Sequence, residues 1–260
     1  MKAGKTHGGR TPTPDDRAAV RRRPGGAPVM FQCWRDLLFL HWEWEAEEVE
    51  KTLPPGLHLD RYEGRCFVGV VPFKMRRVRP RLLPAAPGIS DFLELNLRTY
   101  VHDDAGLPGV WFYSLDANRR LAVTLARRFF SLPYHFAAME IDEEESGAIA
   151  FSSSRRAVPG SRLRYRWRAT GEPRRAAPGS LEYFLLERYV LFASTKSGLR
   201  AGRVHHEPYP IRDVESVVWD GGLLALNGFA PPGRDPDHAV ASRGVDVSIY
   251  PMRPPSGVRA

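Results

Sequence analysis

Residues 92–101 read FLELNLRTYV, a segment in which apolar and polar side chains alternate as far as Arg98. Alternation of this kind indicates a β-strand with two unlike faces, because successive side chains on a strand point to opposite sides of the sheet. One face carries three leucines and the other carries Glu94, Asn96 and Arg98. A turn-rich stretch at 102–109 (HDDAGLPG) and an apolar run at 110–115 (VWFYSL) follow. Together they predict a β-hairpin.

Working outward from this hairpin, most of the chain reads as further strands. Short apolar or β-branched segments between turn residues predict strands at 65–73, 162–169, 190–194, 200–206, 211–219 and 245–250. Helices are fewer, and we expect them at 45–53, 118–130 and 180–187. The fold class is therefore mostly β (α+β), with the sheet curling into a closed barrel or a two-layer sandwich.

The helix predicted at 118–130 has the clearest amphipathic pattern. Asn118 is a suitable N-cap. Leu121, Leu125 and Phe129 recur at i, i+4 and i+8 with arginines on the other side. We therefore expect these three apolar side chains to face the core.

Composition excludes several classes of protein. The chain has 260 residues, of which 43% are hydrophobic and 26% charged, which are values typical of a globular protein. It has no run of about 18 apolar residues and no hydrophobic signal segment, so we expect no membrane interaction and a cytoplasmic location. Cys33 and Cys66 are too few for a disulfide framework and match no zinc motif.

The net charge of +8 is concentrated at the chain ends. Residues 1–29 carry seven basic and two acidic side chains and almost nothing apolar, so we expect a disordered basic tail there. Residues 30–250 are then a single domain that is close to neutral, and 251–260 are a C-terminal tail. Translation starting at Met30 is compatible with this division. Because the domain is close to neutral and the tail has the only long basic cluster, nucleic acid is not an expected partner.

The order of several motifs resembles the uncharacterised DUF2071 family, also called YqjF-like. The matching stretches are WRDLLFLHW at 34–42, LPPGLHLD at 53–60, VGVVPF at 68–73, ELNLRTYV at 94–101, GVWFYSLD at 109–116, LARRFFSLPY at 125–134, LERY at 186–189 and HHEPYP at 205–210. The family is grouped by fold with the acetoacetate decarboxylase-like proteins. The resemblance implies a closed antiparallel β-barrel with flanking strands and a few helices, whose interior holds a small molecule.

The decarboxylases use a Schiff-base lysine next to a second lysine, after a helix and a proline. The helix and Pro133 have counterparts here, but Tyr134 and His135 stand where the two lysines would be. Neither side chain forms an imine, so the resemblance does not carry that chemistry over. Of the chain's few lysines, only Lys74 is positioned to approach a cavity, and a solvated surface position suits it better. We expect no cofactor and no metal.

The resemblance also implies a cavity arginine at Arg35 and, in a less certain register, a cavity glutamate at Glu94. Arg35 lies in an apolar strand, where it needs a partner, and could hold a carboxylate or form an ion pair with Glu94 or Asp36. We therefore expect Arg35 and Glu94 to face one cavity that also receives Tyr134 and His135. Adjacent histidines on a strand point to opposite faces, so only one of His205 and His206 can reach a site. His205 is the one selected.

Two functions remain open at this level. One is an enzyme that transfers protons through His135, Glu94 and Tyr134, with Arg35, Asn96, Arg98 and His205 binding a carboxylate, keto acid or aromatic acid. The other is a non-catalytic protein that binds the same kind of small molecule. The simpler interpretations are that Tyr134 and His135 only fill space, and that the polar face of 92–101 meets water. Sequence leaves the oligomeric state open.

Overall fold

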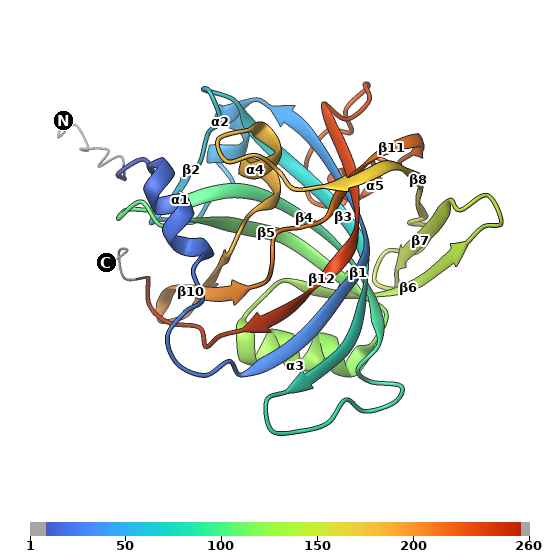
Figure 1. The fold of residues 1–260 in the computed structure, drawn as a ribbon, viewed down its shortest axis with the longest axis horizontal. Coiled ribbons are helices and arrows are strands. Elements are labelled where there is room, and N and C mark those ends of the chain that lie inside the picture. Colours follow the sequence, from blue (N-terminus) through green and yellow to red (C-terminus); the bar gives the residue numbers. More distant parts are fainter. Residues whose placement is uncertain (1–8, 256–260) are drawn as a thin grey trace.

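The computed structural model describes residues 9–255, and its chain order is dominated by strands (Figure 1). The strands are β1 (Met30–Trp44), β2 (Leu57–Leu59), β3 (Cys66–Pro80), β4 (Phe92–Asp103), β5 (Pro108–Ala117), β6 (Tyr134–Glu143), β7 (Ile149–Arg155), β8 (Leu163–Arg174), β9 (Val190–Thr195), β10 (Gly198–His205), β11 (Ile211–Val218) and β12 (His238–Ile249). The helices are α1 (Pro14–Arg21), α2 (Ala46–Glu50), α3 (Arg120–Phe130), α4 (Leu181–Leu186) and α5 (Gly222–Ala225). The predicted mostly-β class is confirmed.

The strands form one continuous sheet that closes on itself. The order β10-β9-β5-β6-β7-β8-β11-β12-β1-β3-β4-β2 has two additional pairings, β10 with β12 and β5 with β4. These close a ring of β1, β3, β4, β5, β9, β10 and β12, which we call the main barrel. The remaining strands β6, β7, β8 and β11 form a side lobe between β5 and β12 (Figure 1). Pairing is antiparallel except between β5 and both β6 and β9.

Strand β4 lies between two hydrophobic cores, and every one of its residues is buried. Leu93, Leu95 and Leu97 pack into the core that the side lobe covers. The opposite face, with Glu94 and Asn96, lies with the core of the main barrel, because Glu94 pairs with Phe73 and Ala117 of that core. The predicted alternation and the β4–β5 hairpin are therefore present. The polar face meets the barrel interior instead of water.

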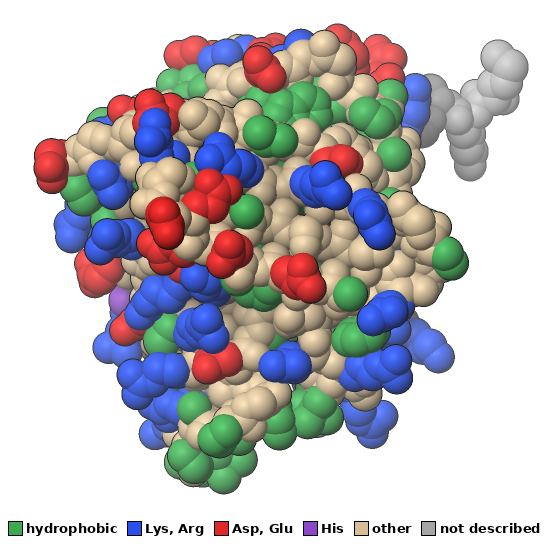
Figure 2. Space-filling model, turned by 90° about the vertical axis from the view of Figure 1, so that its right-hand side faces the viewer, with side chains coloured by type: hydrophobic (Ala, Val, Ile, Leu, Met, Phe, Trp, Pro, Cys, Tyr) green, Lys and Arg blue, Asp and Glu red, His purple; other side chains and the backbone are tan. Residues whose placement is uncertain are grey.

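Charged side chains of both signs are mixed on the face shown in Figure 2, which is the side where the lobe strands lie in Figure 1. Ion pairs join neighbouring strands of the side lobe, such as Arg168 of β8 with Glu215 of β11 at 2.5 Å. Among the described residues no helix is both long and apolar enough to cross a membrane.

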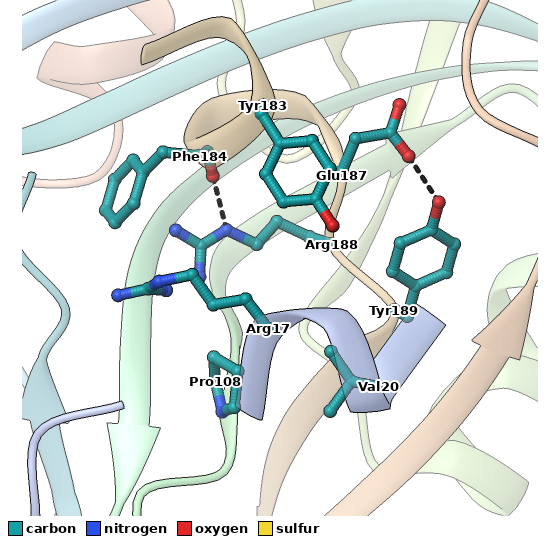
Figure 3. Close-up of a pocket in the computed structure, with 8 residues that line it drawn as sticks. All are labelled: Arg17, Val20, Pro108, Tyr183, Phe184, Glu187, Arg188 and Tyr189. Carbon is teal, nitrogen blue, oxygen red and sulfur yellow. Dashed lines mark hydrogen bonds between the residues drawn. The ribbon is translucent and has the colours of Figure 1, made fainter. Parts of the chain in front are cut away.

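The region expected to be a disordered tail differs from that prediction, because residues 14–21 form helix α1. Thr13 and Asp16 make a reciprocal capping box at its start, and Pro14 occupies its first turn. On its inner side Val20 is only 3% exposed, and Arg17 reaches the buried carboxylate of Asp60. Figure 3 shows Arg17 and Val20 facing the segment that follows α4. The helix is therefore anchored by tertiary contacts that composition does not reveal.

The two chain ends of the predicted tails, 1–8 and 256–260, lie outside the described residues. The first part of the predicted C-terminal tail pairs with the barrel. Arg253 and Ala201 exchange two backbone hydrogen bonds, of 2.7 and 2.9 Å.

Helix α3 also differs from its predicted orientation. Leu121 and Leu125 are 47% and 44% exposed, while Val123 packs into the core of the main barrel together with Ala122 and Ala126. The side chain of Phe129 lies outside the description. The expected cap is wrong as well, because the Asn118 side chain accepts a hydrogen bond from the Leu93 backbone N–H at 2.9 Å.

Candidate functional site

The interior of the main barrel contains buried polar atoms that lack partners. Five such side-chain atoms are without a hydrogen-bond partner: His41 Nε2, Asn96 Oδ1, Arg98 Nε, His206 Nε2 and His238 Nε2. Buried polar groups in proteins are nearly always hydrogen-bonded, so each of these atoms calls for water or a ligand. The interior is thus the first candidate for a binding site.

A carboxyl and a phenol meet at one point in this interior. Glu94 on β4 is 2% exposed, and the Tyr134 hydroxyl at the start of β6 donates to its Oε2 at 2.8 Å. Burial raises the pKa of Glu94 to about 7, although hydrogen bonds from Tyr134 and Asn96 oppose the increase. Burial, together with the negative charge of Glu94, raises the pKa of Tyr134 well above its ordinary value. Near neutral pH, Glu94 can therefore both give and take a proton.

A buried guanidinium lies on the same face of β4, four residues away. Arg98 is 8% exposed, and its Nη2 donates to the Leu185 carbonyl at 3.2 Å and to the Tyr100 hydroxyl at 3.5 Å. Its guanidinium carbon lies 5.7 Å from the ring centres of both Phe39 and Tyr100. Within residues 9–255, no carboxylate forms a salt bridge with Arg98. A positive charge buried without a counterion is suited to binding an anion.

Two histidines face each other beside Arg98. The Nδ1 atoms of His41 on β1 and His238 on β12 are 2.9 Å apart, so one ring donates and the other accepts. Burial lowers the pKa of His41 well below its usual value and that of His238 to about 4, so both rings are neutral at physiological pH. Gly69 on β3 leaves room for this pair, because a Cβ there would lie 2.9 Å from the His41 ring.

A third histidine of the interior is His206. Its ring lies 4.6 Å from the ring of Tyr189 and 4.7 Å from that of Tyr209. Burial lowers its pKa to about 4. His205, which was selected from the sequence, belongs to the opposite face of β10, because its neighbour Val204 packs into the barrel core. Only one of the pair reaches the interior, as expected, but it is His206.

The structure places Arg35 away from Glu94, against the expectation that they face one cavity. Trp34 packs into the barrel core, so Arg35, the next residue on β1, points to the other face of the sheet. There it pairs with Asp246, and its Nη1 donates to the Val245 carbonyl at 2.8 Å. Its side chain is 37% exposed. Asp36, the other partner considered, is bound by Lys74 at 2.7 Å.

His135 is likewise separated from Tyr134, its neighbour on β6. In the parallel pairing with β5 it lies beside Asp116, whose carboxylate accepts from Arg155 Nε at 2.9 Å. Burial lowers the pKa of His135 to about 4, with a further contribution from the positive charges of Arg155 and Arg127. The structure therefore joins Tyr134 with Glu94, Asn96 and Arg98, and leaves His135 on the other face.

No lysine of the described residues lies in the interior. Lys51 and Lys196 are exposed, and Lys74 is engaged by Asp36 on the outer face of β3. Residues 9–255 also contain no group of three histidine, cysteine or acidic side chains placed to bind one metal ion.

Sequence reasoning missed the pair formed by His41 and His238. The signal for His41 was present, because LLFLHW alternates and places Phe39 and His41 on the same face of the strand. Its proximity to His238 depends on the pairing of β1 with β12, residue against residue. That register could not be read from either segment alone.

Comparisons with known proteins agree with this architecture. The family model DUF2071, described as "Uncharacterized conserved protein", matches residues 31–246. The "Uncharacterized protein YqjF" of Bacillus subtilis (strain 168) is 36% identical over 230 residues, which cover 88% of this chain and 94% of that protein.

Solved structures of low sequence identity share the fold. The enduracididine biosynthesis enzyme MppR, complexed with the condensation product of pyruvate and imidazole 4-carboxaldehyde, superposes with a TM-score of 0.64 at 12% identity, covering 88% of this chain and 89% of that one. Acetoacetate decarboxylase from Legionella pneumophila superposes with a TM-score of 0.61 at 11% identity over 100% of both chains. The predicted acetoacetate decarboxylase-like barrel is confirmed.

Proposed function

This chain belongs to the DUF2071 family, and from its barrel interior we propose that it binds a small organic acid and transfers a proton to or from it. The ligand is a carboxylate of the keto acid or aromatic acid type. Arg98 binds its carboxylate, and Glu94, held by Tyr134, is the proton-transfer group.

One observation carries the proposal: the interior holds a buried cation and a buried carboxyl group that do not pair with each other. Arg98 and Glu94 are four residues apart on β4, so their Cα atoms are separated by about 13 Å. Asn96 lies between them on the same face, and its Oδ1 is unpartnered. A ligand that bridges this distance would meet a positive charge at one end and a proton donor or acceptor at the other.

The chemistry suited to these groups is general acid–base catalysis. A carboxyl group with a pKa of about 7 is well matched to removing a proton from the carbon next to a ketone, or to protonating its oxygen. Imine formation has no counterpart among the described residues of the interior, because it requires a lysine. MppR has been seen in complex with pyruvate, which makes a keto acid a reasonable first probe.

The alternative function is binding without catalysis. Aromatic rings form much of the interior wall around Arg98, including Phe39, Tyr100 and Tyr209. Such a wall favours an aromatic acid that would be held and released unchanged. The two functions share a ligand and differ only in whether Glu94 exchanges a proton with it.

The test compares binding with proton exchange, using pyruvate, phenylpyruvate and benzoate as probes. Calorimetry measures binding, and NMR in heavy water measures deuterium incorporation at the carbon next to the keto group. We expect Arg98→Met to weaken binding by about tenfold or more, the loss typical of a charge-assisted hydrogen bond. Arg35→Met is the matched control, because it removes an arginine from the other face of the sheet.

Glu94→Gln distinguishes the two functions. For an enzyme it abolishes deuterium exchange and leaves binding within about threefold of the wild type. Binding without exchange in the wild type would identify a non-catalytic binding protein. Absence of binding for all three acids, or equal losses in Arg98→Met and Arg35→Met, would refute the interior as an organic-acid site. Circular dichroism of each variant verifies folding.

A further inference from the structure

A cavity lies outside the main barrel, on the outer face of the side lobe. Its volume is about 610 Å³, within the range of small-molecule sites. Residues from β6, β7 and β8 line it. On the face they share, Ala138 pairs with Ser154, and Ser152 pairs with Arg164. The small side chains of Ala138, Ser152 and Ser154 form the floor of the cleft, and longer side chains lie around this floor.

Three arginines surround this floor without partners. Arg156, Arg162 and Arg164 line the cleft and are exposed, and none of their side chains forms a hydrogen bond or ion pair with another described residue. The other arginines of β8, which are Arg166, Arg168 and Arg174, are all paired. Arg166 binds Glu144 at 2.8 Å and Arg168 binds Glu215 at 2.5 Å. On β8, the arginine that lines the cleft is therefore the one without an ion pair.

The cleft also has hydroxyl groups and one acidic side chain. Ser152 and Ser154 alternate with Ser153 along β7, so both face the floor, and hydroxyls donate readily to anions. The acidic side chain is that of Glu140, which lies opposite Ser152 on the neighbouring strand. Its single negative charge does not neutralise the positive charges of the three arginines. Figure 2 shows this side of the molecule, where charged side chains of both signs surround a broad area of backbone and uncharged side chains.

One of the residues that line the cleft is aromatic. Phe136 on β6 lines it, and the Arg120 guanidinium at the start of α3 lies 4.8 Å from the centre of that ring. The ring adds an apolar surface beside the arginines. It can pack against a flat group of the ligand.

We propose that the cleft formed by Phe136, Ser152, Ser154, Arg156, Arg162 and Arg164 binds a small phosphate monoester that carries an aromatic or other flat apolar group. A phosphate monoester has close to two negative charges and three acceptor oxygens, which suits several guanidinium groups and two hydroxyls at once. A lone carboxylate offers less charge and fewer acceptors. The apolar group lies against Phe136.

This site is independent of the organic-acid site proposed above. Phe136 follows Tyr134 by two residues on β6 and packs against the core of the main barrel. The serines and arginines of the cleft, however, belong to β7, β8 and the segment between them, whereas Glu94 and Arg98 are buried within the main barrel. Removing the cleft arginines should therefore leave organic-acid binding unchanged.

The test titrates the full chain with phenyl phosphate, inorganic phosphate, benzoate and a short single-stranded oligonucleotide. Phenyl phosphate should bind about tenfold more tightly than inorganic phosphate, since stacking on Phe136 adds to the phosphate contacts. Benzoate should not compete at the cleft. The double variant Arg162→Ala/Arg164→Ala should weaken phenyl phosphate binding by about tenfold or more. Phe136→Leu should reduce the preference for phenyl phosphate over inorganic phosphate.

The control variant is Arg168→Ala, which removes a paired arginine of the same strand. It should bind phenyl phosphate like the wild type. A loss as large as in the double variant would mean that only overall charge matters, and would overturn the proposal. So would tighter binding of the oligonucleotide than of phenyl phosphate, which would point to nucleic acid, or the absence of binding by both phosphates.

Discussion

Replacing Arg17 tests whether helix α1 is part of the folded domain. The carboxylate of Asp60 is fully buried and is held by two guanidinium groups, Arg17 at 2.5 Å and Arg188 at 2.6 Å. The side chain of Arg17 is 18% exposed and that of Arg188 4%. Arg17→Ala thus takes one of two cations away from a carboxylate that has no access to water.

The size of the effect follows from this geometry. Removing the only partner of a buried charge costs about 3–5 kcal/mol, but Arg188 remains in place, so we expect a loss of about 2 kcal/mol. At this chain length each kcal/mol lowers the melting temperature by about 2–4 °C, which predicts a decrease of about 4–8 °C. Burial of Asp60 raises its pKa, but Arg188 and Arg17 together lower it further, to below the ordinary value.

Because the folded-state pKa of Asp60 is depressed, its contribution to stability is complete above the unfolded-state pKa of about 4. It is lost as the pH falls through the folded-state value. The difference between Arg17→Ala and the wild type should therefore shrink in acid. Thermal and urea unfolding between neutral and acidic pH measure it.

Arg22→Ala, one residue beyond α1 and exposed, is the matched control and should leave the melting temperature unchanged. Combining Arg17→Ala with Asp60→Asn closes a double-mutant cycle, in which the two effects should not add. A melting temperature for Arg17→Ala within about 1 °C of the Arg22→Ala control would refute the reasoning.

Three further predictions concern the two cores. Burial raises the pKa of Glu94 to about 7, so the stability that its protonated form contributes is present below the unfolded-state pKa of about 4.3 and is lost as the pH rises to 7, by on the order of 3 kcal/mol. Urea unfolding of Glu94→Gln should lack this decline, and a pH profile identical to that of the wild type would contradict the assignment. Gly69→Ala places a methyl group 2.9 Å from the His41 ring and should lower the free energy of unfolding by about 1–3 kcal/mol, with loss of any interior ligand. Unfolding and binding like those of the wild type would show that the His41 ring moves freely. Arg155→Met leaves the buried carboxylate of Asp116 without its ion-pair partner and should lower the free energy of unfolding in urea by about 3–5 kcal/mol. Adding Asp116→Asn to the same chain should recover part of this stability.

Local periodicity was sufficient for the central strand and its hairpin. Alternation at 92–101 predicted β4 and its polar face, and the turn residues at 102–109 predicted the return to β5, because both depend on neighbouring residues only. Helix α4 could be predicted from local sequence in the same way, since Ser180 caps it by accepting a hydrogen bond from the Tyr183 backbone N–H. The closed mostly-β class followed from the number of such segments and from the family resemblance.

Which side chains of a helix pack against the core, and to which face of a sheet a side chain points, were harder to predict from the sequence. In α3, leucine spacing pointed to a packed face, but the residues that pack against the core are Ala122, Val123, Ala126 and Phe130. In β1, the pair Trp34–Arg35 gave no indication of which side chain faced the barrel. The bulge after Arg35, where Asp36 has a φ of 51°, interrupts the alternation that would have helped.

The sequence by itself determined which residues of this protein can carry charge and protons, and which of them share one face of a strand. Glu94, Asn96 and Arg98 were together in the sequence pattern and remain together in the fold. The family resemblance already implied that Glu94 faces a cavity that receives Tyr134, and the structure joins these two side chains. Tertiary structure alone decided that Arg35 and His135 face the other side of the sheet. The physical reason is that alternation specifies two faces without saying what covers them. That depends on strand register and ring closure, which join segments more than a hundred residues apart, such as β1 and β12.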